Sequence, residues 1–152
     1  ALPTTASGSN QILTGSGSAT SEGFLSQSSD ARYLVAVGYA AAPGTASVTA
    51  TLAPATPRVV ARIALDGTVD TSTALGDCYS NGNIRSACTT DGTSIWVAGN
   101  ASAANGNGVR FTTFGGTTTT QLSTSPTNIR TIGIFGDQLY CGTSSNPFQG
   151  VS

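Results

Sequence analysis

The sequence contains no histidine, no lysine and no methionine, and charged residues make up only 9% of its 152 residues. Without an imidazole, histidine general-base catalysis and Ser-His-Asp triads are excluded. All six basic residues are arginines and the formal net charge is -1, so no basic field draws the chain to nucleic acid or to an anionic bilayer. No apolar run approaches the roughly 20 residues that span a membrane. We therefore expect neither a nucleic-acid partner nor membrane insertion.

Cysteine is scarce as well. Three cysteines form an odd set, which cannot pair completely within one chain. They show no Cys-x-x-Cys spacing, so the sequence predicts no zinc site. Cys78 and Cys88 bracket a polar turn and are candidates for a disulfide in an oxidising compartment, while a buried free thiol is the alternative for Cys88. Cys141 is left over, either buried or paired outside the chain.

A short unit recurs in the rest of the sequence. A polar turn at Asp91-Gly92 leads into the apolar run 95–98, which holds the only tryptophan and is followed by Gly99. The same order of turn, short apolar run and glycine occurs at 29–38 and at 136–142. The runs are short and carry no helical periodicity. The sequence therefore predicts an all-β protein.

The distance between the repeats indicates the architecture. Asn83-Ile84-Arg85 returns 45 residues later as Asn128-Ile129-Arg130. Four short strands in a unit of roughly 40 to 50 residues is typical of a β-propeller blade. We predict antiparallel four-stranded blades of a β-propeller, in a partial arc of about three blades. The approximate repeats are 20–75, 76–123 and 124–152, and residues 1–19 are predicted as the edge strand of a preceding blade.

The expected strands follow from the same pattern. Asp66-Gly67 between apolar runs predicts a hairpin with a type I′ turn, which needs positive φ at both central residues. Residues 44–56 are expected to form a long exposed loop. The predicted strands are 23–27, 33–37, 58–65, 68–72, 83–88, 95–98, 108–114, a threonine-rich strand through Leu122, 128–134 and 139–142.

These residues resemble a known group. The likeness is carried by Asp30-Ala31-Arg32-Tyr33, Asp66-Gly67-Thr68-Val69-Asp70, Asn83-Ile84-Arg85, Asp91-Gly92-Thr93-Ser94-Ile95-Trp96 and Gln138-Leu139-Tyr140. It is a resemblance to secreted β-propeller-like repeat proteins of unassigned function, which are usually longer chains. The resemblance implies the propeller fold and a secreted or extracellular location. It implies no mechanism, because none of the shared motifs is catalytic.

A partial arc predicts a partner. Such an arc leaves sheet faces and strand edges uncovered, which favours aggregation, and repeat arrays need about three units and capped ends. The chain begins with Ala1 rather than methionine and is interpreted as a processed chain or a fragment of a longer propeller. We therefore expect another chain or a second copy to complete the propeller.

Candidate chemistry is sparse. Four of the acids, Asp30, Asp66, Asp91 and Asp137, lie at predicted turns, where aspartate bonds its own backbone. Asp66 and Asp70 lack the denser oxygen spacing of a calcium loop, so a hairpin is the preferred interpretation. No catalytic residue, metal site or cofactor is predicted. Asn100-Ala101-Ser102 is a candidate N-glycosylation triplet if the source is a eukaryote.

Arginine and tyrosine give the candidate ligand-binding residues. Arg85 and Arg130 recur at equivalent positions and could bind an anionic or sugar ligand bidentately. The structural alternative is an ion pair, or a fork that caps carbonyls between adjacent blades. Tyr39 and Tyr79 are the candidates for stacking on a glycan. The leading hypothesis is a non-catalytic extracellular structural or interaction protein. One alternative is a carbohydrate-binding propeller, whose partner would be a glycan. The other is a fragment of a secreted propeller enzyme that acts on polysaccharide.

Overall fold

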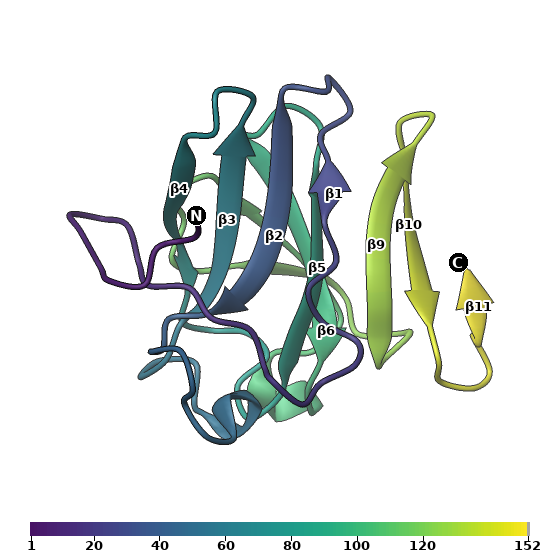
Figure 1. Cartoon of the computed structure of the whole chain (residues 1–152). Helices are drawn as coiled ribbons and strands as arrows, with labels where there is room; N and C mark the ends of the chain where they lie inside the picture. The colour runs from purple at the N-terminus through teal and green to yellow at the C-terminus, as the bar shows by residue number, and fades with distance from the viewer. Residues whose placement is uncertain (152) are drawn as a thin grey trace.

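The structure is a computed structural model that describes residues 1–151, and it confirms the all-β class. Three antiparallel sheets make up the fold (Figure 1). The first sheet contains β1 (Ser26–Gln27), β2 (Tyr33–Tyr39), β3 (Arg58–Ala64) and β4 (Val69–Leu75). The second contains β5 (Asn83–Thr89), β6 (Ser94–Asn100), β7 (Val109–Thr113) and β8 (Thr120–Ser123). The third contains β9 (Ile129–Phe135), β10 (Gln138–Thr143) and β11 (Gly150–Val151).

Each sheet is a meander, in which strands that follow one another in the chain are neighbours. Such pairs need only short turns, because antiparallel neighbours meet at the same end. Two short 3-10 turns, η1 (Val48–Ala50) and η2 (Ala103–Asn105), lie in longer connections. The three sheets lie within the ranges 20–75, 76–123 and 124–152, so each stretch of the sequence repeat forms a sheet of its own.

The sheets pack face to face through apolar side chains. One buried cluster joins the first sheet to the second, and its members include Val35, Val37, Val60, Leu75, Ile84, Ile95 and Val97. Another joins the second sheet to the third, with Cys88, Ala98, Val109, Ile129, Ile132 and Cys141. The second sheet is therefore covered on both faces. This explains why six of the seven residues of β5 are buried, while β8 at the outer edge is largely exposed.

The first strands of the three sheets, β1, β5 and β9, lie next to one another. The turn after β1 meets the turn after β5, where Ser29 N–H donates to the Thr89 carbonyl at 3.2 Å. The side chain of Ser86 in β5 accepts a hydrogen bond from the Ile132 N–H of β9, also at 3.2 Å. These contacts place β1, β5 and β9, each the edge strand of its own sheet, in one row (Figure 1).

The hairpin predicted at Asp66-Gly67 is present, but its turn type was predicted wrongly. Gly67 has a φ of 84°, whereas Asp66 is not among the residues with positive φ. Gly67 N–H bonds the Ala64 carbonyl, and Ala64 N–H bonds the Thr68 carbonyl. This is a three-residue loop with glycine at its left-handed position, which also suits the right-handed twist of a hairpin. Asp66 instead accepts the Thr68 N–H at 2.8 Å.

The N-terminal segment, residues 1–14, covers the outer face of the first sheet. Leu13 is 6% exposed and packs with Ala36, Val59 and Ala61 on that face. Thr14 exchanges two backbone hydrogen bonds with Tyr39 at the end of β2. Within residues 1–19 only isolated bridges occur, so the edge strand predicted there is replaced by an extended cover.

Candidate functional site

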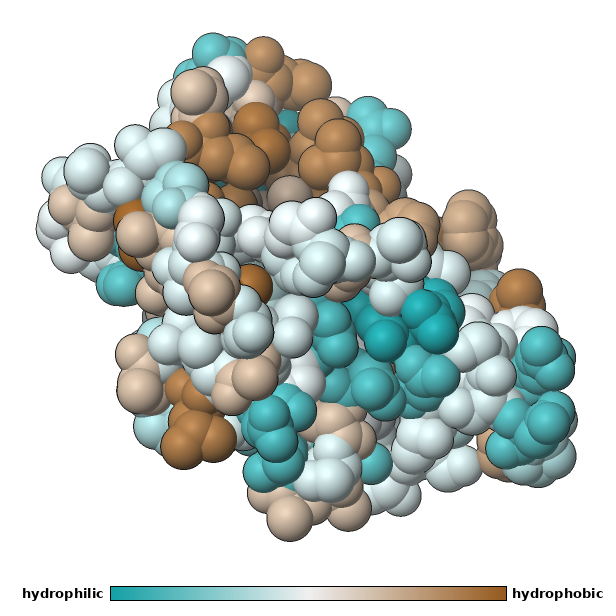
Figure 2. Space-filling model, turned by 60° about the horizontal axis from the view of Figure 1, so that its bottom comes forward, coloured by the Kyte–Doolittle hydropathy of each residue, from teal (hydrophilic) through white to brown (hydrophobic). Residues whose placement is uncertain are grey.

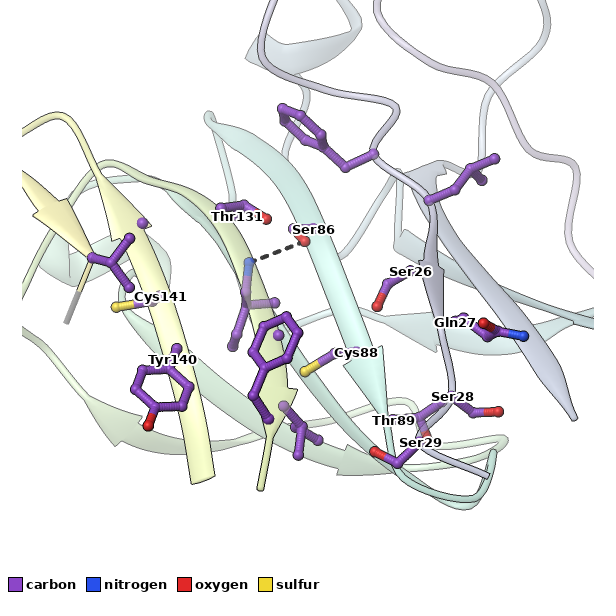
Figure 3. Close-up of a pocket in the computed structure, with 18 residues that line it drawn as sticks. Ser26, Gln27, Ser28, Ser29, Ser86, Cys88, Thr89, Thr131, Tyr140 and Cys141 are labelled. Atoms are coloured by element: carbon purple, nitrogen blue, oxygen red, sulfur yellow. Dashed lines mark hydrogen bonds between the residues drawn. The ribbon is translucent and has the colours of Figure 1, made fainter. Parts of the chain in front are cut away.

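A groove of about 580 Å³ lies between β1, β5 and β9. Figure 3 shows Ser26 on β1, Ser86 and Cys88 on β5, Thr131 on β9, and Tyr140 and Cys141 on β10. Its volume falls within the range of small-molecule sites, roughly 300–1,000 Å³. The edge strands β1, β5 and β9, together with β10, therefore form a groove large enough for a small ligand.

The groove is suited to contact rather than to proton transfer. Its lining residues within 1–151 include neither aspartate, glutamate nor arginine. Burial raises the pKa of the Cys88 thiol to about 12 and also raises that of Cys141, so both sulfurs are protonated at neutral pH. Phe24, Leu25 and Phe135 are exposed at its walls. These groups offer apolar contacts and hydroxyl hydrogen bonds.

A polar cluster lies at the end where β5 and β9 begin. Arg85 Nη1 donates to Asn128 Oδ1 at 2.5 Å and to the Ile129 carbonyl at 3.3 Å. Asn128 Nδ2 then donates to Ser144 Oγ at 2.8 Å, and Arg130 Nε donates to the same oxygen at 3.1 Å. Figure 2 views this end and shows strongly hydrophilic side chains gathered on it. The structure thus brings the repeated arginines together through Asn128 and Ser144.

The two guanidinium groups have no acid partner within salt-bridge distance among residues 1–151, where the pairs found are Arg32–Asp30 and Arg110–Asp77. Arg85 is 6% exposed, and its Nε is buried without a hydrogen-bond partner. Burial lowers the pKa of Arg85, and the positive charge of Arg130 lowers it further. The cluster therefore holds positive charge that protein groups do not neutralise by contact.

Glu22 is the carboxylate that reaches this region. Its Oε1 accepts hydrogen bonds from Tyr39 Oη at 2.5 Å and from Asn83 Nδ2 at 2.6 Å, and its Oε2 accepts the Ser16 N–H at 3.2 Å. Its charge raises the pKa of Arg85, against the larger effects of burial and Arg130. Three donors already occupy this carboxylate.

Arg58 joins the first sheet to the second near the same end. It is fully buried, and Nη2 donates to the Thr51 carbonyl at 2.8 Å and to the Gly82 carbonyl at 3.2 Å. Its guanidinium carbon lies 5.0 Å from the centre of the Tyr39 ring. Like Arg85, it crosses from one sheet to the residues that begin the next. These contacts match the structural alternative for the arginines, a fork that caps carbonyls between sheets.

The tyrosine and cysteine candidates lie in the core. Tyr39 and Tyr79 are both fully buried, and Tyr79 Oη donates towards the Val97 and Gly108 carbonyls at 2.9 Å each. Neither ring presents a face to solvent for a glycan. The candidate disulfide is absent and Cys88 is the buried free thiol of the alternative, because Cys78 packs between the first and second sheets and Cys88 between the second and third.

The remaining candidates have local roles. Asn100 is the last residue of β6 rather than a loop residue, and it is half-buried opposite Asn83. Its glycosylation stays a prediction. Asp30 accepts hydrogen bonds from Ser28 and Arg32, which lower its pKa to about 2. Asp91 accepts the Thr93 N–H at 2.8 Å. These aspartates act in turns, as their positions in the sequence indicate.

Sequence reasoning identified Arg85 and Arg130 but missed Asn128 and Ser144, which bond them, and Glu22, whose charge acts on Arg85. A signal for Asn128 was present, because it belongs to the repeated Asn-Ile-Arg tripeptide. Glu22 and Ser144 lie far from it in sequence and carry no such signal. In these cases folding alone brings the polar groups together.

Within residues 1–151, no group of three or more His, Cys, Asp or Glu side chains is placed to hold a metal ion. A helix with the length and apolar character to cross a membrane is likewise not found in that range. None of the protein-family models, curated proteins or solved structures compared with this chain matches it. The functional argument therefore depends on the geometry alone.

Proposed function

We propose that the chain is a non-catalytic interaction protein on a partial β-propeller scaffold, and that it pairs with a second copy through the open face of its third sheet. The propeller arrangement is supported by three successive meander sheets whose first strands form one inner row. An extracellular location is part of the same proposal. It is supported by the scarcity of charge and the absence of lysine, which leave the surface to serine, threonine, asparagine and glycine.

The observation that carries the proposal is an exposed aromatic pair. Ile132 and Cys141 pack against the second sheet, so alternation along the strands directs Phe135 and Tyr140 to the opposite face. Phe135 is 70% exposed and Tyr140 38% exposed, with ring centres 6.3 Å apart. Gly133 lies opposite Tyr140, and a Cβ at this glycine would meet the Phe135 ring at 3.1 Å. Glycine therefore makes room for the pair.

The second sheet carries a similar aromatic pair on the face that the third sheet covers. Trp96 and Phe111 also form an aromatic pair, with ring centres 5.4 Å apart, and Trp96 packs against the cluster that joins the second sheet to the third. The pair on the third sheet lacks such a neighbour among residues 1–151. Contiguous exposed aromatic surface is typical of interaction sites.

A second copy is the partner that the geometry favours. The outer face of the first sheet is occupied by residues 1–14, so it does not offer a free surface for head-to-tail stacking. The face around Phe135 and Tyr140 also carries Thr131, Gly133 and Gly142, which are uncharged, so two copies can approach without repulsion. Pairing of identical faces about a two-fold axis closes at a dimer, the commonest symmetric assembly.

The native mass tests this proposal. We expect the purified chain to run as a dimer of 15.1 kDa subunits by light scattering at micromolar concentration. Tyr140→Asp and Phe135→Asp should give monomers with unchanged circular dichroism, because a carboxylate on this face would be buried in the interface. Leu65→Asp is the matched control, since Leu65 is 82% exposed on the first sheet's hairpin. A monomeric wild type, or a dimer that both aspartates leave intact, would contradict the proposal.

A further inference from the structure

The end of the molecule where β5 and β9 begin holds an unusual share of the positive charge. The chain has six basic and seven acidic residues, yet Arg58, Arg85 and Arg130 all lie at this end. Glu22 is the carboxylate that lowers their combined charge, and its oxygens already accept three hydrogen bonds. An excess of positive charge therefore gathers on one end of a protein whose net charge is -1.

Neutral groups hold two of these arginines in place. Asn128 accepts from Arg85 through Oδ1 and donates to Ser144 through Nδ2, and Ser144 Oγ accepts from Arg130. The Nε of Arg85 is buried and has no partner within residues 1–151. Burying a charge without a counter-charge is unfavourable, so a bound anion would relieve a cost that the folded protein already carries. The guanidinium groups are fixed before any ligand arrives.

We propose that Arg85 and Arg130, with Asn128 and Ser144, bind the carboxylate group of a small monoanionic ligand. The planar guanidinium fork matches the two oxygens of a carboxylate. A monoanion suits the site better than a dianion, because the charge of Glu22 offsets part of the positive charge. Arg130 is partly exposed and gives the ligand access from solvent, whereas Arg85 is 6% exposed.

This site is independent of the proposed dimer. Arg130 lies near the beginning of β9, whereas Phe135 ends the same strand and Tyr140 lies across from Gly133. Each copy contains the whole cluster. Loss of ligand binding would therefore leave the native mass unchanged, and loss of the dimer would leave ligand binding unchanged.

The test is a titration of the full chain with galacturonate, acetate and inorganic phosphate, followed by calorimetry and by the arginine Nε–Hε signals in NMR spectra. We expect galacturonate and acetate to shift the signals of Arg85 and Arg130, with binding that weakens as sodium chloride is added. Arg130→Gln should weaken binding about tenfold, the effect of losing one hydrogen bond from a charged group. Arg85→Lys keeps the charge but removes the fork, and it should weaken binding several-fold.

Arg32→Gln is the matched control, because Arg32 pairs with exposed Asp30 at the turn before β2 and should leave the affinity unchanged. Equal binding of galacturonate and acetate supports recognition of the carboxylate alone, and tighter binding of galacturonate supports added contacts to the sugar. Phosphate that binds more tightly than both would overturn the carboxylate assignment. Carboxylate binding that Arg130→Gln leaves unchanged, or no shift at either arginine, would overturn the site itself.

Discussion

The outer face of the first sheet is covered by the chain, whereas the outer face of the third sheet is exposed. On the first sheet, residues 1–14 cross the outer face, and Leu13 buries itself against Ala36, Val59 and Ala61. On the third sheet, the outer face carries Phe135 and Tyr140, both exposed. One end of the stack is thus covered by the chain itself, and the other presents aromatic rings to solvent.

Side-chain size explains the difference. The first sheet presents small residues on its outer face, and Gly38 brings the backbone close enough for the Thr14 carbonyl to lie 2.4 Å from where a Cβ would stand. A single extended segment with one leucine can cover such a flat surface. Two aromatic rings need a deeper apolar partner, such as another sheet. The flat face is therefore covered within the chain, while the aromatic face is available for association.

The largest effect is expected from removing the leucine that covers the first sheet. Leu13→Ala should lower the free energy of unfolding by about 2–4 kcal/mol, because it removes buried methyl groups and leaves a cavity under an extended segment. Urea denaturation measures the change, with Leu65→Ala as an exposed control that should shift it by less than about 0.5 kcal/mol. Equal effects of the two substitutions would show that residues 1–14 do not cover this face.

A smaller effect is expected from Gly38→Ala. The added methyl group would clash with the Thr14 carbonyl, so the segment must move away from β2 at a cost of about 1–3 kcal/mol. Hydrogen exchange should then accelerate at Thr14 and Tyr39, whose backbone groups bond each other. Gly17→Ala is the control, because a Cβ there would meet nothing within 4 Å. Unchanged exchange at both residues would argue against the close approach.

The smallest effect is expected in the labelling rates of two cysteines, one in the groove and one between the first and second sheets. This measurement requires no change in stability. Cys141 is 8% exposed and lines the groove, whereas Cys78 is fully buried between two sheets. Burial raises the pKa of Cys78 to about 12, so its thiolate is scarce at pH 8. An aromatic disulfide reagent should label Cys141 first and Cys78 last, and Cys141→Ser should remove the fast phase. Labelling of Cys78 at the same rate would contradict this packing.

Much of the strand pattern was predictable. The run at 83–88 matches β5 and the run at 128–134 matches β9 to within one residue. Both runs are bounded by turn residues and contain isoleucine, which favours strands, although only β5 is buried on both faces. β4 was predicted at 68–72 instead of Val69–Leu75, so the predicted strand begins one residue early and ends three residues early. The missed residues 73–75 are threonine, alanine and leucine, and Thr73 and Leu75 are buried in the structure.

The site was predicted less completely. The repeated tripeptide identified Arg85 and Arg130, since equivalent positions in a repeat occupy equivalent places in the structure. The tyrosines were misjudged, because nothing local distinguishes a ring that faces solvent from one that fills the core between two sheets. Cys78 and Cys88 looked close in sequence but lie in separate buried clusters on the two sides of the second sheet.

The sequence by itself determined the all-β class, the order of the strands and the hairpin at Asp66-Gly67, because these depend on residues that are neighbours in the chain. Only the tertiary structure decided which faces are covered, that Tyr39 is buried, that Ser144 bonds Arg130, and that the charge of Glu22 acts on Arg85. The physical reason is the range of the interactions. Turn geometry and strand alternation act over a few residues, whereas burial and charge clustering depend on sheets that meet only after the chain has folded.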